Sequence, residues 1–261
     1  MKFLLLSLAV LVSSCAINVH KNDNVTVKKD EIGKAEHLVA ATLWVQKSAE
    51  YDALCYQAYN IATDRLNELL KHHKKGKKLA IVLDVDETVL NNTPFQGTLI
   101  KENQIFDQNL WTEWVRMEKG VPLAGAKEFL TYADQKGVEI FYVSNRDEGA
   151  EEEATFNNLK KVGIPVKKEN LLFKEGKSSK EPRRQQVAAK YELALLFGDN
   201  LIDFAEGFEG YEGDKRKVNV EARRTDWGKK FIVLPNPMYG DWLKPLNKEK
   251  KPLRELATPM K

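Results

Sequence analysis

The stretch LAIVLDVDET, residues 79–88, decides the fold that this sequence predicts. Its apolar run is not interrupted by a polar residue, which is typical of a strand buried on both faces in a parallel sheet. Alternate residues of a strand point to the same side, so Asp84 and Asp86 are expected to emerge together where the strand ends. Open α/β sheets bind ligands at the carboxyl ends of their strands, and this acidic pair is therefore a candidate site.

The same pattern returns along the chain, with helical segments between the apolar runs. Further strands are expected at 139–143, 171–173, 193–197 and 231–234. Helices are expected at 123–136, 148–162 and 181–191. Strands that alternate with helices at this spacing predict right-handed βαβ units and a parallel sheet.

Composition limits the class of protein. At 261 residues, with 43% hydrophobic and 30% charged side chains, the chain is long enough for one large globular domain and a small cap. Its 41 basic and 38 acidic residues give a net charge of only +3, so no nucleic-acid partner is expected.

The N-terminus predicts secretion and a lipid anchor. Residues 1–14 have the basic start, short apolar region and small residues of a signal peptide. Val12-Ser13-Ser14-Cys15 is similar to a bacterial lipobox, which implies acylation of Cys15, with palmitate among the acyl chains. The polar residues that follow predict a tether over 15–30. Ala16 favours the outer membrane of a Gram-negative cell envelope. The alternative is an ordinary signal peptide, and Cys55 is interpreted as a buried structural thiol.

Polar residues follow three of the expected strands. They are Asp84 and Asp86, then Ser144, Asn145 and Arg146, then Asp199, Asn200 and Asp203. Carboxylates are ligands that suit Mg²⁺, and a bound Mg²⁺ can neutralise the charge of a substrate phosphate. One Asp can then attack phosphorus as the nucleophile, and a second Asp can donate and accept protons.

Two other designs are excluded. An EF-hand loop starting at Asp84 would need Gly where Val89 stands. A P-loop ending at Lys177 would need Gly where Leu171 stands.

Two motifs carry a family resemblance. DVDETVL at 84–90 and GDNLIDF at 198–204 resemble the signature motifs of class C acid phosphatases, bacterial lipoproteins of the haloacid dehalogenase (HAD) superfamily. The resemblance covers about 38–242. It implies an α/β fold with a HAD-like three-layer Rossmannoid core, a parallel sheet and a small, mainly helical cap.

The helical pattern of the sequence and the resemblance together give the expected domain organisation. The expected parts are N-terminal helices at 31–75 that break around 48–52 and join the cap, a catalytic core at 76–242 with a cap insertion at about 91–120, and a C-terminal tail at 243–261.

The resemblance further implies roles for particular residues. Asp84 is the expected nucleophile and Asp86 the general acid/base. Mg²⁺ is expected on the Asp84 carboxylate, the Asp86 backbone carbonyl and Asp199, with Asp203 in support. Phosphate is expected on Ser144, Asn145 and Lys180, with Lys177 as the alternative lysine. The other basic residues nearby, Arg183 and Arg184 among them, are expected on the solvated surface.

The resemblance also covers family positions whose aromatic rings stack on a nucleotide, here Phe95, Trp111 and Tyr239. Phe95 replaces the usual Tyr, and the alternative for Trp111 is that it simply packs the cap.

We therefore expect Mg²⁺-dependent hydrolysis of phosphomonoesters, 5′-nucleotides included, at acidic pH and at the cell envelope. The alternatives are another HAD hydrolase activity and a surface lipoprotein that captures a nucleotide or cofactor. A homodimer is left open.

Overall fold

A computed structural model describes residues 35–74, 76–208, 213–249 and 253–257. The expected signal peptide, the tether and Cys15 lie outside these residues. No helix among the described residues is long and apolar enough to cross a membrane.

Within the described residues, five strands form one parallel sheet in the order β5-β4-β1-β6-β7. The strands are β1 (Leu79–Leu83), β4 (Glu139–Asp147), β5 (Leu171–Lys174), β6 (Glu192–Gly198) and β7 (Phe231–Val233). Leu83 of β1 pairs with Tyr142 on one side and Phe197 on the other, so the carboxyl ends of three neighbouring strands meet at one edge. The expected α/β fold is confirmed.

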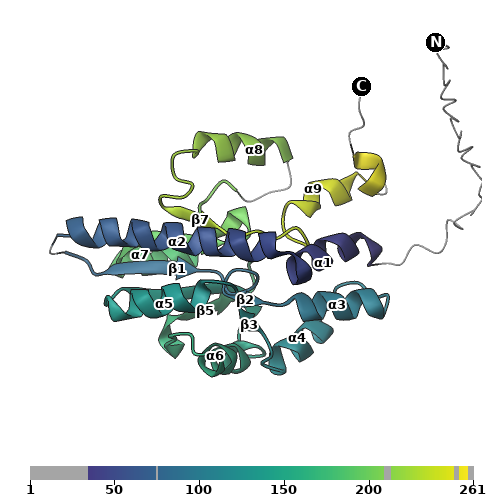
Figure 1. Ribbon diagram of the computed structural model, residues 1–261, viewed down its shortest axis with the longest axis horizontal. Helices are drawn as coiled ribbons and strands as arrows, with labels where there is room; N and C mark the ends of the chain where they lie inside the picture. Colours follow the sequence, from purple (N-terminus) through teal and green to yellow (C-terminus); the bar gives the residue numbers. More distant parts are fainter. Residues whose placement is uncertain (1–34, 75, 209–212, 250–252, 258–261) are drawn as a thin grey trace, which may run out of the picture. The chain divides into compact units, whose positions relative to one another are not determined.

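Alternation along β1 assigns its side chains to the two faces of the sheet. Leu79, Ile81 and Leu83 belong to one apolar cluster, and Ala80 and Val82 to another. The first face is covered by α2 (Ala49–His72), α5 (Ala126–Gln135) and α6 (Glu152–Lys161). The second is covered by α7 (Glu181–Lys190), η3 (Leu201–Asp203) and α8 (Gly213–Ala222). Figure 1 shows α2 running along the sheet.

The long helix α2 is part of the layer that covers the sheet. Its Tyr59 ring lies 5.6 Å from Phe129 of α5 and 5.9 Å from Phe197 of β6, between ring centroids. The preceding α1 (Val39–Lys47) instead packs on α3 (Thr93–Lys101). Of the N-terminal helices, α1 therefore contacts the insertion, whereas α2 covers the sheet. The expected break lies at Ser48, whose Oγ accepts a hydrogen bond from Tyr51 N and caps α2.

The insertion after β1 is more regular than its sequence suggests. The short strands β2 (Leu90–Asn91) and β3 (Val121–Pro122) pair antiparallel and bring its two ends together. Between them lie α3 and α4 (Gln108–Arg116), which share an apolar cluster of Phe95, Leu99, Trp111, Trp114 and Val115. The sequence of α3 contains Pro94 and Gly97, two residue types that are unfavourable inside a helix. Pro94 lies in the first helical turn, where its missing N–H costs nothing.

Glu139 of β4 is a buried acidic residue whose pKa is shifted by its partners. Its buried carboxylate accepts hydrogen bonds from Lys78, Lys167 and Asn170. Burial alone would raise the pKa of Glu139, but these bonds outweigh it and lower the pKa from 4.5 to about 2. A depressed folded-state pKa stabilises the protein above the unfolded-state value, and this contribution disappears as the pH falls to about 2.

We expect Glu139→Gln to lower the free energy of unfolding by about 1–2 kcal/mol at neutral pH, because the two lysines are half exposed and solvent weakens their attraction. Urea titrations should show the difference from wild type shrinking as the pH falls from about 5 to about 2. A difference that does not change with pH would contradict this assignment.

Candidate active site

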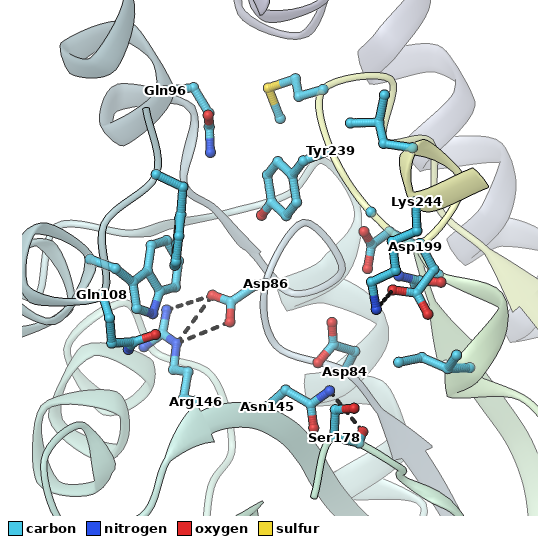
Figure 2. Close-up of a pocket in the computed structure, with 18 of the residues that line it drawn as sticks. Asp84, Asp86, Gln96, Gln108, Asn145, Arg146, Ser178, Asp199, Tyr239 and Lys244 are labelled. Atoms are coloured by element: carbon cyan, nitrogen blue, oxygen red, sulfur yellow. Dashed lines mark hydrogen bonds and ion pairs between the residues drawn. The ribbon is translucent and has the colours of Figure 1, made fainter. Parts of the chain in front are cut away.

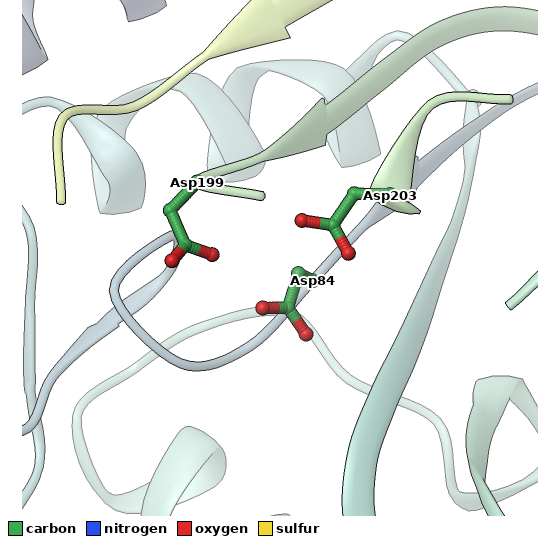
Figure 3. Close-up of side chains that lie close together, drawn as sticks. All are labelled: Asp84, Asp199 and Asp203. Atoms are coloured by element: carbon green, nitrogen blue, oxygen red, sulfur yellow. The ribbon is translucent and has the colours of Figure 1, made fainter. Parts of the chain in front are cut away.

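The acidic side chains predicted at the strand ends converge. Asp84 follows β1 directly, Asp199 follows β6, and Asp203 ends η3. Each contributes a carboxylate oxygen to a group in which all these atoms lie within 4.8 Å of one another, as Figure 3 shows. The backbone N of Asp84 donates to Phe197 O at 3.1 Å, which fixes the start of this group on the neighbouring strand.

The glycine of the second motif makes room for this cluster. A Cβ atom at Gly198 would lie 2.2 Å from Asp203 Oδ2, a distance that no side chain tolerates. Asp203 Oδ2 also accepts a hydrogen bond from Asn200 N at 2.9 Å, so the turn after β6 is closed by its own carboxylate. The Gly-Asp-Asn…Asp spacing is therefore required by packing as well as by chemistry.

Lys180, the residue before α7, brings the matching positive charge. Its Nζ lies 2.6 Å from Asp84 Oδ1 and 2.6 Å from Asp203 Oδ1. Lys180 is buried, whereas Lys177 is exposed. Of the two lysines that the sequence left open, the structure brings Lys180 into the carboxylate cluster.

Burial controls the electrostatics of the cluster. Burial raises the pKa of Asp84. The negative charges of Asp203 and Asp86 raise this pKa further, and the positive charge of Lys180 opposes the increase. Burial also raises the pKa of Asp199, with Asp203 and Asp84 adding to the effect. For Lys180, burial alone would lower the pKa, but the attraction of Asp203 and Asp84 outweighs it and keeps the ammonium charged.

The donor set fits a divalent cation. Both oxygens of Asp203 are engaged, by Lys180 and by Asn200 N. Asp199 Oδ2 accepts from Asn236 Nδ2 at 2.8 Å, whereas its Oδ1 has only a long contact of 3.5 Å to Thr88 Oγ1 among the described residues. Asp84 and Asp199 are therefore the carboxylates best able to hold a metal, with Asp203 in support. Hard carboxylate oxygens carrying excess negative charge suit Mg²⁺.

Asp86 lies on the other side of Asp84 and has a different partner. Arg146 Nη2 donates to Asp86 Oδ1 at 2.7 Å, and Arg146 Nε lies 3.1 Å from Oδ1 and 3.2 Å from Oδ2. Figure 2 shows this pair beside the cavity. From the sequence, Arg146 was noted only as a neighbour of Ser144, because no nearby residue in the sequence indicates that it contacts Asp86.

The carboxyl-terminal part of β4, which includes Ser144 and Asn145, is held by a buried arginine that was expected on the surface. Arg183 Nη1 donates to Ser144 O at 2.5 Å, and Nη2 donates to Asn145 Oδ1 at 2.6 Å. Asn145 Nδ2 donates to Ser178 O at 2.9 Å. The expectation that Arg183 is solvated is wrong, and Arg184 is also buried, where it donates to Ile202 O at 2.7 Å.

A cavity of about 800 Å³ opens over these groups. Asp84, Asp86, Asn145, Lys180, Asp199 and Asp203 line it together with the aromatic residues Phe106, Trp111 and Tyr239. Ser144 is buried and does not line the cavity; its Oγ accepts a hydrogen bond from Arg146 N.

Phe95 is also absent from the cavity wall. It is 4% exposed and packs edge-on against Trp111, with ring centroids 5.2 Å apart. Phe106, which is 58% exposed and not predicted from the sequence, lines the cavity instead.

Comparisons with known proteins agree with this geometry. The family model of the HAD superfamily, subfamily IIIB (acid phosphatase), matches residues 4–242. The class C acid phosphatase of Bacillus anthracis shares 40% identity with a TM-score of 0.79, covering 85% of this chain and 94% of that one. The same class of enzyme from this organism with tungstate bound shares 39% identity at the same TM-score, covering 85% and 93%.

Two curated relatives are more distant. The class B acid phosphatase of Morganella morganii is 20% identical over 185 residues, which is 67% of this chain and 74% of the relative. The stem 28 kDa glycoprotein of Glycine max is 27% identical over 194 residues, which is 70% of this chain and 65% of the relative.

The fold and the site together define a phosphomonoesterase, a hydrolase of phosphate esters. The chain belongs to the acid phosphatases of HAD subfamily IIIB. Phosphatases of this superfamily typically use a divalent metal, and the carboxylate cluster supplies a place for one.

Proposed function

We propose that this acid phosphatase is Mg²⁺-dependent, acts through an aspartyl-phosphate on Asp84, and hydrolyses phosphomonoesters that include 5′-nucleotides. The observation that carries the proposal is the joint position of Asp84, Lys180 and Asp199 at the wall of one cavity. A binding protein would not need a nucleophile, a proton carrier and a charged lysine at one end of its ligand.

The reaction follows from the positions of two carboxylates. An oxygen of Asp84 attacks phosphorus, the bond from phosphorus to the leaving oxygen breaks, and protonated Asp86 gives its proton to that oxygen. Water then attacks the phosphoryl group, Asp86 takes back a proton, and the bond from phosphorus to Asp84 breaks. The products are the alcohol and inorganic phosphate.

The remaining residues bind and orient the phosphoryl group. Lys180 Nζ contacts Asp84 Oδ1, so its positive charge can offset the negative charge that develops between this carboxylate and the phosphoryl oxygens. Asn145 lines the cavity beside it, and buried Ser144 precedes Asn145 on the same strand. A metal ion held by Asp84 and Asp199, with Asp203 in support, would neutralise phosphate charge when bound.

Removal of metal tests this proposal directly. We expect EDTA to lower hydrolysis of p-nitrophenyl phosphate at acidic pH by at least about 100-fold, because the buried carboxylates then repel the phosphate. Adding Mg²⁺ back in excess should restore the rate. Full activity after exhaustive chelation, with metal absent by elemental analysis, would contradict a metal-dependent mechanism.

The aromatic residues of the cavity support nucleotide substrates. Phe106, Trp111 and Tyr239 present rings beside the carboxylates, and a ring stacked on a base contributes about 1–3 kcal/mol. We expect Tyr239→Leu to lower kcat/KM for AMP roughly tenfold or more, and to leave glycerol 2-phosphate within about twofold.

Tyr239→Phe is the matched control for this prediction, because it keeps the ring and loses the hydroxyl. It should retain most of the preference for AMP. Equal losses on AMP and on glycerol 2-phosphate would mean that Tyr239 shapes the cavity without recognising a base.

The cellular location rests on the sequence. We propose a lipid anchor at Cys15 and a place in the outer membrane of the cell envelope, supported by the signal-like residues 1–14. Labelled palmitate should enter the wild type but not Cys15→Ser. A homodimer stays a prediction that sedimentation analysis can check.

A further inference from the structure

Arg146 is a buried cation whose hydrogen bonds are directed at one catalytic side chain. Its side chain is 1% exposed, and both Nε and Nη2 donate to Asp86. Nη1 donates to Thr155 Oγ1 at 2.9 Å, and this hydroxyl donates in turn to Glu151 O at 2.7 Å. A guanidinium is a rigid planar fork, so these contacts fix its orientation as well as its charge.

The aromatic wall of the cavity adds a further restraint. The guanidinium carbon of Arg146 lies 5.7 Å from the centre of a Trp111 ring, within the range of a cation–π contact. Trp111 lines the cavity and is itself packed by Phe95 from behind. The arginine is therefore held by α6 through Thr155 and by α4 through Trp111.

The two oxygens of Asp86 are not equivalent as a result. Within the described part of the chain, Oδ1 accepts from Asn92 Nδ2 at 2.9 Å and from Arg146 Nη2 at 2.7 Å and Nε at 3.1 Å. Oδ2 accepts one bond, from Arg146 Nε at 3.2 Å. A carboxylate oxygen has two lone pairs, so Oδ1 is fully used and Oδ2 keeps capacity for a further partner.

We propose that Arg146 is a positioning residue that fixes the rotation of the Asp86 carboxylate, so that Oδ2 alone exchanges a proton with the leaving oxygen. This inference rests on the proposed role of Asp86 as the general acid. In the first chemical step the Oδ2–H bond breaks, its proton goes to the leaving oxygen, and the bond from phosphorus to that oxygen breaks as Asp84 attacks. Arg146 itself does not touch the reacting atoms.

A leaving-group comparison isolates this role. Glycerol 2-phosphate expels an alkoxide that needs a proton, whereas 2,4-dinitrophenyl phosphate expels an anion that is stable without one. The ratio kcat/KM reports only the steps up to release of the leaving group, so it excludes the later attack by water. We expect Arg146→Gln to lower kcat/KM roughly 100-fold for glycerol 2-phosphate and less than about fivefold for 2,4-dinitrophenyl phosphate.

Two milder variants keep the test valid if Arg146→Gln does not fold. Arg146→Lys keeps the charge but loses the fork, and Thr155→Val removes the hydrogen bond to Nη1 with little change of volume. Both should show the same selective loss with a smaller factor. Arg216→Gln is the matched control, since Arg216 is another buried arginine, which donates to Phe208 O and has no contact with Asp86. It should affect both esters equally.

The outcomes separate this inference from the function on which it rests. The inhibition constant of inorganic phosphate should stay within about threefold in every variant, which reports an intact phosphate site. Equal losses on both esters in Arg146→Gln and Arg146→Lys would overturn the positioning role. If Asp86→Asn lowers kcat/KM equally for the two esters, Asp86 is not the general acid. That result would refute the proposed function of Asp86, and the positioning role of Arg146 would be refuted with it.

Discussion

Asp84→Asn should lower kcat for p-nitrophenyl phosphate by a factor on the order of 10⁴ or more, because an amide cannot act as the nucleophile. Asparagine fills nearly the same volume between β1 and Lys180, so the fold should persist. The measurement is steady-state hydrolysis at acidic pH with Mg²⁺ present, accompanied by circular dichroism and thermal unfolding of the same sample.

Asp86→Asn provides the comparison for this experiment. It keeps the nucleophile and removes the proton carrier, so its loss should depend on the leaving group, whereas the loss in Asp84→Asn should not. Turnover by Asp84→Asn equal to that of the wild type would refute the assignment of Asp84.

Lys180→Met should reduce both activity and stability. Its ammonium lies 2.6 Å from Asp84 and from Asp203, and methionine leaves these buried carboxylates without their cation. Breaking a buried ion pair on one side costs about 3–5 kcal/mol. Loss of a charge that stabilises the transition state costs about 10²–10³ in kcat. Urea unfolding at neutral pH and kcat for p-nitrophenyl phosphate measure the two effects.

Lys177→Met is the matched control, because it removes the same charge three positions earlier on an exposed side chain. It should leave both quantities almost unchanged. Equal effects of the two substitutions would mean that net positive charge near the cavity matters, and that the contact between Lys180 and Asp84 does not.

The predictable parts of the site are those that follow from the local sequence pattern together with the regular geometry of a parallel sheet. The apolar run before Asp84 identifies a central strand, and parallel strands must bring Asp84 and Asp199 to the same edge. The family resemblance favoured Lys180 over Lys177 within one four-residue window, and Lys180 is the buried one of the two in the structure. These inferences need no knowledge of distant contacts.

The parts that were missed depend on contacts between segments far apart in the chain. Arg183 is polar and was expected in solvent, but it is buried against Ser144 of β4. The apolar face of α2 would look the same whether it covered a cap or the sheet. Phe95 and Phe106 are both aromatic, and spacing does not show which ring faces the cavity and which packs behind Trp111.

The most direct test of the account is to trap the phosphoryl group on the protein. In Asp86→Asn, 2,4-dinitrophenyl phosphate should still phosphorylate Asp84, while attack by water is slowed because its base is missing. After an acid quench within one turnover, peptide mass mapping should find one added phosphoryl group on the peptide that contains Asp84, and none in Asp84→Asn/Asp86→Asn. A phosphoryl group at another residue, or its persistence in the double variant, would contradict nucleophilic attack by Asp84.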